Sequence, residues 1–279
     1  MNVLKAEGLT KRYSGFTLDN ASFELQKGKI TGFIGRNGAG KTTTLKSMLN
    51  IVHPDSGKVY FFGKEFAEAE MEIKRRIGFV AGGFNYFLLK KLKAITSVVK
   101  NFYPDWDDNA YREYIRLFGL DENKRVAMLS AGMKVKYFLA LALSHRAELL
   151  ILDEPTSGLD PVSRDEILDI FLSLAAEGKT IFFSTHIISD LKRCADRIIY
   201  IKNGKIIADD DVENFEAGYR LVYFDTEPAE LEKEFIIGLR KERKGFSGLI
   251  KAENAQYVSG TIEAADLENI MLHIEREGV

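Results

Sequence analysis

The eight residues GRNGAGKT, at positions 35–42, constrain the fold of this chain more than any other stretch. They follow the apolar run KITGFIG (29–35) and lead into TTTLKSMLN (42–50), so a strand enters the loop and a helix leaves it. Glycines let backbone N–H groups turn inward, and the start of a helix adds partial positive charge, so such a loop can surround phosphates. The strand–loop–helix unit predicts an α/β fold that binds a nucleoside triphosphate.

Each residue of this loop has an expected task. Lys41 is placed to reach the β- and γ-phosphates, Thr42 to ligate Mg²⁺, and Thr43 to offer a hydroxyl to the α-phosphate. The expected nucleotide-binding residues of the loop are Gly35, Arg36, Asn37, Gly38, Ala39, Gly40, Lys41, Thr42 and Thr43.

A second strand ends in two acids, in the stretch LLILDEP (149–155). Ligands of an open α/β sheet sit beyond the carboxyl ends of its strands, so Asp153 and Glu154 are expected near the Thr42 hydroxyl. Asp153 is the predicted Mg²⁺ partner. Glu154 is then free to orient and polarise an attacking water as a general base.

Short apolar runs separated by helical stretches predict a mostly parallel sheet covered on both faces. Two strand-like segments open the chain as an antiparallel β subdomain, residues 84–146 contain no convincing strand, and the pattern changes after Asp211. We therefore expect a core domain over 1–213, with a helical subdomain at about 84–146, and a small α+β region over 214–279. The runs assigned to the sheet are KITGFIG (29–35), RRIGFV (75–80), ELLILDE (148–154), KTIFFST (179–185) and RIIYIKNGKII (197–207).

Composition narrows the class of protein. A net charge of −2 gives no basic footprint for nucleic acid, so none is expected as a partner. Cys194 is the one cysteine, which rules out an internal disulfide and fits a reducing compartment. Charged residues at the start argue against a signal peptide, and the longest apolar runs fall short of the roughly 20 residues that cross a bilayer. We expect a protein that serves a membrane, if it does, from outside the lipid.

Five motifs occur in a characteristic order: GRNGAGKT, LSAGMK (129–134), LLILDEP, SGLD (157–160) and STH (184–186). Together they resemble the nucleotide-binding subunit of an ABC transporter, over about residues 1–213. The resemblance implies a P-loop fold, Mg²⁺-dependent ATP hydrolysis, a second ATPase subunit and a separate transmembrane permease. It also implies a peripheral position on the cytoplasmic face of a membrane. The segment FYPDWDD (102–108) and the GMK of the signature are similar to the drug and antibiotic exporter branch.

The resemblance assigns tasks to further residues. The signature residues Ser130, Ala131, Gly132 and Met133 would close over the γ-phosphate held by another subunit. Asp160 would lie along that interface, and His186 would contact the γ-phosphate and the attacking water. Tyr13 matches the aromatic that stacks on adenine. Lys41, Glu154 and His186 are thus the expected catalytic residues.

One position departs from the family pattern. Gly82, in IGFVAGGFNY (77–86), stands where the family has a glutamine or glutamate that touches Mg²⁺ or its water and links to the membrane partner. We expect water to fill that gap, and contact with the partner to depend on Phe84, Tyr86 and Phe87. The alternative is that these aromatics pack the helical subdomain.

Two other functions stay open from sequence. One is an ABC ATPase acting on DNA or ribosomes, although those relatives carry long insertions or two cassettes that this chain lacks. The other is an ATP-dependent clamp that scarcely hydrolyses, for which the absent glutamine is the motive and against which Glu154 and His186 argue. The partner subunit could be a second copy or a paralogue.

Overall fold

The computed structural model describes residues 2–81 and 87–277. By their contacts these residues divide into two compact units, Met1–Asp209 and Asp210–Val279, here called the first and the second unit. Each is described by itself. Within the described ranges, no helix is long and apolar enough to cross a bilayer.

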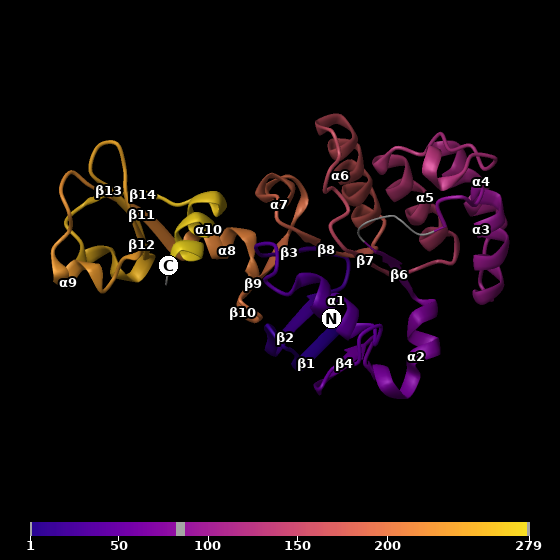
Figure 1. Cartoon of the computed structure of the whole chain (residues 1–279), viewed down its shortest axis with the longest axis horizontal. Helices are drawn as coiled ribbons and strands as arrows, with labels where there is room; N and C mark the ends of the chain where they lie inside the picture. The colour runs from indigo at the N-terminus through magenta and orange to yellow at the C-terminus, as the bar shows by residue number, and fades with distance from the viewer. Residues whose placement is uncertain (1, 82–86, 278–279) are drawn as a thin grey trace. The chain divides into compact units, whose positions relative to one another are not determined.

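The first unit is built around a six-stranded sheet (Figure 1). The pairs β3/β8, β3/β9, β7/β8 and β6/β7 are parallel, and strands β3, β7 and β8 are buried along their whole length. This confirms the predicted mostly parallel sheet. In spatial order its strands are β10 (Lys205–Asp211), β9 (Arg197–Lys202), β3 (Ile30–Ile34), β8 (Thr180–Thr185), β7 (Leu149–Leu152) and β6 (Ile77–Val80).

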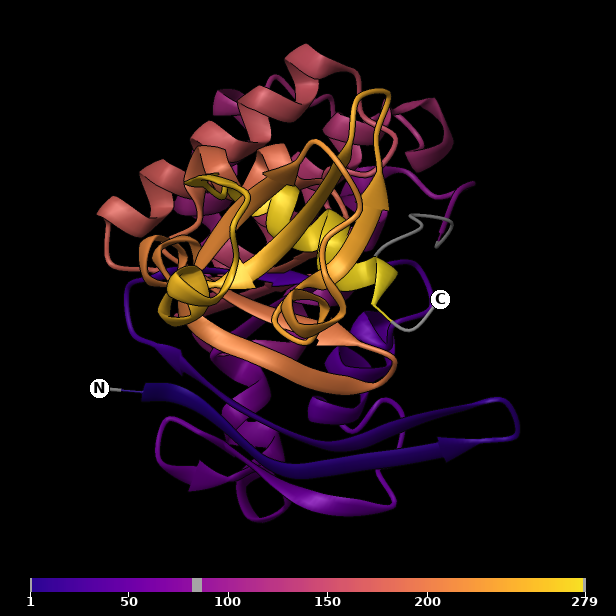
Figure 2. The same ribbon diagram turned by 90° about the vertical axis from the view of Figure 1, so that its left-hand side faces the viewer.

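An antiparallel sheet formed by the start of the chain adjoins the central one. Its long first hairpin is visible in Figure 2, and Tyr13 pairs with Phe16 across the two-residue turn. Phe23 of this sheet packs on Phe33 and Phe182 of the central sheet, with ring centroids 6.0 and 5.8 Å away, so one aromatic core serves both sheets. The strands, in spatial order, are β2 (Phe16–Gln26), β1 (Asn2–Tyr13), β4 (Ser56–Phe61) and β5 (Lys64–Glu65).

Helices fill the connections of the first unit. The predicted helical insert lies between β6 and β7, and its helix α5 is buried on most sides because its sequence is apolar on most sides. The helices are α1 (Lys41–Met48), α2 (Phe66–Arg75), α3 (Leu92–Val99), α4 (Asp108–Leu117), α5 (Ala131–Ser144), α6 (Pro161–Ala176) and α7 (Ile188–Cys194), with 3₁₀ turns η1 (Lys100–Phe102) and η2 (Val126–Met128).

The second unit is a four-stranded sheet with helices, as the α+β pattern predicted. One cluster of its core contains Val222, Phe224 and Ile250, and Leu249 and Ile270 are also fully buried. In spatial order the strands are β12 (Ile237–Lys241), β13 (Phe246–Lys251), β11 (Tyr219–Phe224) and β14 (Thr261–Ala264), and the helices are α8 (Val212–Ala217), α9 (Glu230–Lys233), η3 (Ala252–Tyr257) and α10 (Leu267–Arg276).

The structure differs from the sequence reading at the run 197–207. That run is two strands, β9 and β10, joined by Asn203 and Gly204, whose φ angles are +48° and +80°. Two consecutive positive φ angles at Asn-Gly define a type I′ turn, which reverses the chain into a hairpin. Strand β10 therefore ends the sheet as an edge strand, and its alternating exposure contrasts with the buried β9.

Candidate nucleotide-binding site

The phosphate loop links β3 to α1 and depends on its glycines. Gly38 and Gly40 have φ angles of +84° and +114°, a region that other residues rarely adopt. A Cβ atom on Gly40 would lie 2.7 Å from Phe16 Cζ, and one on Gly35 would lie 2.3 Å from the Ile201 carbonyl oxygen. At Gly35 and Gly40 the loop therefore has room for backbone and none for a side chain, which suits a phosphate cradle.

Lys41 is the first residue of α1, and its side chain is only 5% exposed. Its ammonium donates to the Gly35 carbonyl at 2.7 Å and lies 3.1 Å from Glu154 Oε1. The cation is thus already folded back over the loop, held by groups that a phosphate oxygen could replace.

The next contact joins the loop to the ends of β7 and β8. Thr42 Oγ1 donates to Asp153 Oδ2 at 2.8 Å, and Ser184 Oγ donates to Asp153 Oδ1 at 2.7 Å. Ser184 Oγ in turn accepts the backbone N–H of Glu154 at 2.9 Å. A buried carboxylate beside a threonine hydroxyl is an oxygen donor set that suits Mg²⁺. Thr42 and Asp153 therefore fit the ion that the loop would bring with its phosphates.

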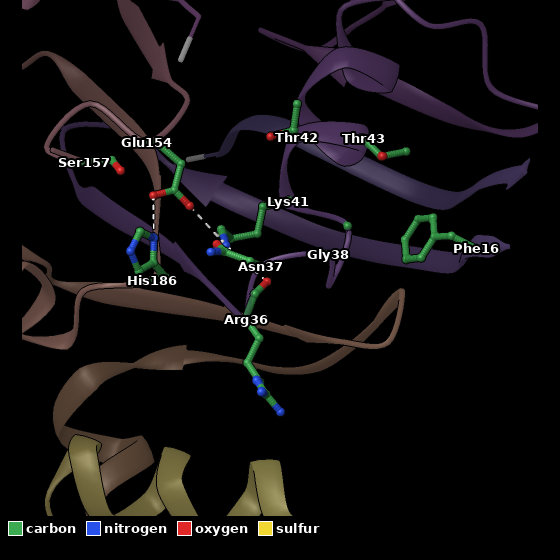
Figure 3. Close-up of a pocket in the computed structure, with 11 residues that line it drawn as sticks. Phe16, Arg36, Asn37, Gly38, Lys41, Thr42, Thr43, Glu154, Ser157 and His186 are labelled. Atoms are coloured by element: carbon green, nitrogen blue, oxygen red, sulfur yellow. Dashed lines mark hydrogen bonds and ion pairs between the residues drawn. The ribbon is translucent and has the colours of Figure 1, made fainter. Parts of the chain in front are cut away.

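Glu154 lies across from the phosphate loop and contacts two other predicted residues, Lys41 and His186 (Figure 3). Its Oε1 meets Lys41, and its Oε2 lies 2.8 Å from His186 Nδ1. Its backbone φ of +49° is in the left-handed region, a costly conformation for a glutamate and one often found at functional sites. Since β3, β8 and β7 are neighbours, their carboxyl ends bring the loop, His186 and Glu154 to one edge of the sheet.

These residues surround a cavity of about 480 Å³. Figure 3 shows Glu154 and His186 on one side of the loop and Phe16 on the other, while the Arg36 side chain points away from Glu154. The lining is formed by Phe16, Arg36, Asn37, Gly38, Gly40, Lys41, Thr42, Thr43, Glu154, Ser157 and His186. Gly35 and Ala39, also predicted, are not part of this lining: the Gly35 carbonyl accepts from Lys41, and Ala39 is buried.

Tyr13 lies outside this lining. Its ring is 47% exposed and sits 5.9 Å from the Lys11 ammonium. Phe16, its partner across the β1–β2 turn, lines the cavity and packs on Gly40. Sequence reasoning missed Phe16, although its place directly after the Ser14-Gly15 turn, opposite Tyr13, could have suggested that one of the two rings faces the loop.

The signature residues do not line the cavity. Ser130 caps α5, accepting the Met133 N–H at 3.2 Å, and Ala131 begins that helix. A Cβ on Gly132 would lie 3.3 Å from the Ser163 side chain. Asp160 caps α6, and hydrogen bonds from Ser163 and Val162 hold the pKa of its carboxyl below the usual range. Within one chain, these residues cap or begin helices. Among the described residues, none of them makes a hydrogen bond or ion pair with the phosphate loop.

Gly82, Phe84 and Tyr86 lie outside the described residues, while Phe87 is 62% exposed. Ser157 and Ser184, which the sequence analysis did not select, contact the cavity and Asp153 respectively. Ser184 could have been found, because it directly precedes the Thr-His pair at the end of β8.

Comparison with known proteins places these features in one family. The ABC transporter family model matches residues 18–157. The chain is 37% identical over 209 residues to the bacitracin transport ATP-binding protein BcrA of Bacillus licheniformis, covering 74% of this chain and 68% of that protein. It is 33% identical over 221 residues to the lantibiotic transport ATP-binding protein SrtF of Streptococcus pyogenes, covering 77% and 93%.

Comparison with solved structures supports the same family. The ATP-binding subunit of an ABC transporter matches with a TM-score of 0.69 at 25% identity, over 77% of this chain and 92% of that one. The residues matched by the family model, 18–157, include the phosphate loop, the signature and the strand-end acids. The chain therefore belongs to the ABC transporter family, as one of its ATP-binding subunits.

Proposed function

We propose that this chain hydrolyses ATP with Mg²⁺ and thereby drives a separate membrane permease that exports antibiotic-like compounds. One observation carries the hydrolytic part: Glu154 lies between Lys41 and His186 at the edge of the cavity, at 3.1 and 2.8 Å. The names of the bacitracin and lantibiotic relatives support the class of cargo.

The residues divide the work of hydrolysis between them. Phosphate oxygens entering the loop compete with Glu154 for the Lys41 ammonium, because they are anions at hydrogen-bond range of the same cation. The freed Glu154 carboxylate can accept a hydrogen bond from water and orient it toward the γ-phosphate, with His186 holding the carboxylate in place. When bound by Thr42 and Asp153, Mg²⁺ would neutralise charge on the phosphate oxygens.

A second subunit would complete the site. Ser130 and the start of α5 present a hydroxyl and helix N–H groups, which suit an anion, yet they do not line the cavity of their own chain. We therefore assign Ser130, Ala131, Gly132 and Met133 to the γ-phosphate of a partner subunit, with Asp160 at the interface. The assembly would sit on the cytoplasmic face of the membrane, against the permease.

The test uses Glu154→Gln, which keeps the shape of the side chain and removes its basicity. The variant should bind ATP with Mg²⁺, hydrolyse it negligibly, and double its molar mass in solution when ATP is added. Ser130→Ala in the same background is the matched control, and it should bind ATP without dimerising. An absence of Mg²⁺-dependent ATP turnover by the unmodified chain would contradict the proposal. Binding of ATP by Glu154→Gln without dimerisation would mean that the partner signature comes from another chain or that closure needs the permease.

A further inference from the structure

Two loop segments that flank the cavity are joined by two parallel contacts. One segment follows β7 and carries Glu154, Thr156 and Ser157, and the other follows β8 and carries His186 and Asp190. The first contact is between Glu154 Oε2 and His186 Nδ1, at 2.8 Å. The second lies deeper, where Thr156 Oγ1 donates to Asp190 Oδ2 at 2.5 Å. Both contacts therefore join the segment after β7 to the segment after β8. The Glu154–His186 contact lies beside the cavity, and the Thr156–Asp190 contact lies among buried side chains.

Asp190 is an unusual residue for its surroundings. It is fully buried in α7, and burial raises the pKa of its carboxyl. Among the buried side-chain atoms of the described residues, its Oδ1 lacks a hydrogen-bond partner, and so does Arg164 Nε. These two atoms lie 3.9 Å apart, beyond the 2.7–3.2 Å of an N–H···O hydrogen bond. A buried carboxylate is costly unless it is bonded, so its presence calls for an explanation.

The position of Arg164 explains why a carboxylate is buried here. Arg164 belongs to the first turn of α6, whose cap is Asp160, and its backbone N–H bonds to the Asp160 carbonyl. Asp190, in the helix that follows His186, therefore accepts a hydrogen bond from Thr156 beyond Glu154 and faces Arg164 at the start of α6. A single carboxylate thus links the segment after β7, the segment after β8 and the start of α6.

We propose that Asp190 is a positioning residue for hydrolysis, which through Thr156 holds the segment bearing His186 in register with the segment bearing Glu154. The inference rests on the proposed ATPase function. It predicts that loss of the buried contact misplaces Glu154 against His186 and slows the chemical step. Displacements of about 1 Å at a catalytic group can cost roughly 10²-fold in rate. Binding of the triphosphate depends on the loop and Lys41, which Asp190 does not touch, so affinity should change little.

The experiment compares Thr156→Val with Thr156→Ser. Valine keeps the shape and removes the donor, and serine keeps the donor. We expect Thr156→Val to lower kcat by roughly tenfold or more while KM for ATP stays within about twofold, and Thr156→Ser to stay near the unmodified rate. Asp190→Asn keeps an acceptor for Thr156 and should therefore also stay near the unmodified rate.

A carboxylate with a purely structural task provides the control. Asp196 accepts the Ile30 N–H at 2.8 Å, where β3 begins, at the end of the sheet away from the cavity. Asp196→Asn should lower thermal stability without changing kcat. An unchanged kcat in Thr156→Val, equal losses in the serine and valine variants, or a KM change as large as the kcat change would each refute the assignment. These outcomes are distinct from failure of the proposed function, in which the unmodified chain itself would show no turnover.

Discussion

Three alanine substitutions in the phosphate loop separate two reasons for having glycine there. Gly38 has a positive φ and no atom within 4 Å of an added Cβ, so its substitution tests backbone strain alone. Gly35 has no positive φ and a Cβ site 2.3 Å from the Ile201 carbonyl oxygen, so it tests crowding alone. Gly40 combines a φ of +114° with a Cβ site 2.7 Å from Phe16 Cζ.

The expected costs follow from these geometries. A left-handed alanine costs about 1–2 kcal/mol, and the stiffer unfolded chain returns about 0.4–1 kcal/mol, so Gly38→Ala should destabilise by about 1 kcal/mol. Crowding in a packed interior costs about 1–3 kcal/mol, which sets the scale for Gly35→Ala. Gly40→Ala adds strain to crowding and should cost about 2–5 kcal/mol.

Urea unfolding followed by tryptophan fluorescence measures this series. Trp106 is the only tryptophan and lies in the first unit with the loop, so the signal reports the unit that is changed. The urea midpoint should be lowered least in Gly38→Ala, more in Gly35→Ala and most in Gly40→Ala, with an unchanged slope of free energy against urea. A loss for Gly38→Ala as large as that for Gly40→Ala would refute the separation of strain from crowding.

Two more predictions follow from the site and its surroundings. Phe16→Ala should weaken ATP binding by roughly tenfold, on the scale of about 1–3 kcal/mol for a base stacked on an aromatic ring, and leave binding of inorganic tripolyphosphate unchanged. Equal losses for both ligands would mean that the ring supports the loop, and Tyr13→Ala measured alongside tests the exposed ring. Burial lowers the pKa of the His145 imidazole to about 4. Between about pH 6.5 and pH 4, the unfolded chain therefore binds a proton at this residue and the folded chain does not. Stability should therefore fall as pH drops from about 6.5 toward 4, and His145→Phe should flatten that fall by up to about 3 kcal/mol.

Much of the fold could be read from the sequence because its signals are local. The apolar runs that became β3, β7 and β8 are buried on both faces, and this is why they lack alternation. The glycine loop and the acids Asp153 and Glu154 stand at strand ends, so topology alone brought them together. Strand β13 was not expected, because FSGLIK is short and mixed in polarity, and its burial depends on neighbours in the second unit.

The rest of the site depended on side-chain direction, which spacing does not encode. Tyr13 and Phe16 are equivalent as aromatic residues beside one turn, and only the packing of Phe16 on Gly40 distinguishes them. Asp190 stands in the short helix ISDLKRC, and no sequence pattern marks it as buried. Its burial follows from the packing of α7 against β3 and α6, a contact between elements distant in the sequence.

The Asn203-Gly204 turn has a consequence for how the protein is made. Gly204 donates its N–H to the Ala39 carbonyl in the phosphate loop, and its carbonyl accepts the Asp19 N–H of β2. The loop thus gains its outer support from a residue synthesised long after it. Because chains fold progressively as they emerge from the ribosome, a nascent chain that ends before Gly204 carries the whole loop without this support. Nucleotide binding should therefore arise late in translation, once the β9–β10 hairpin has formed.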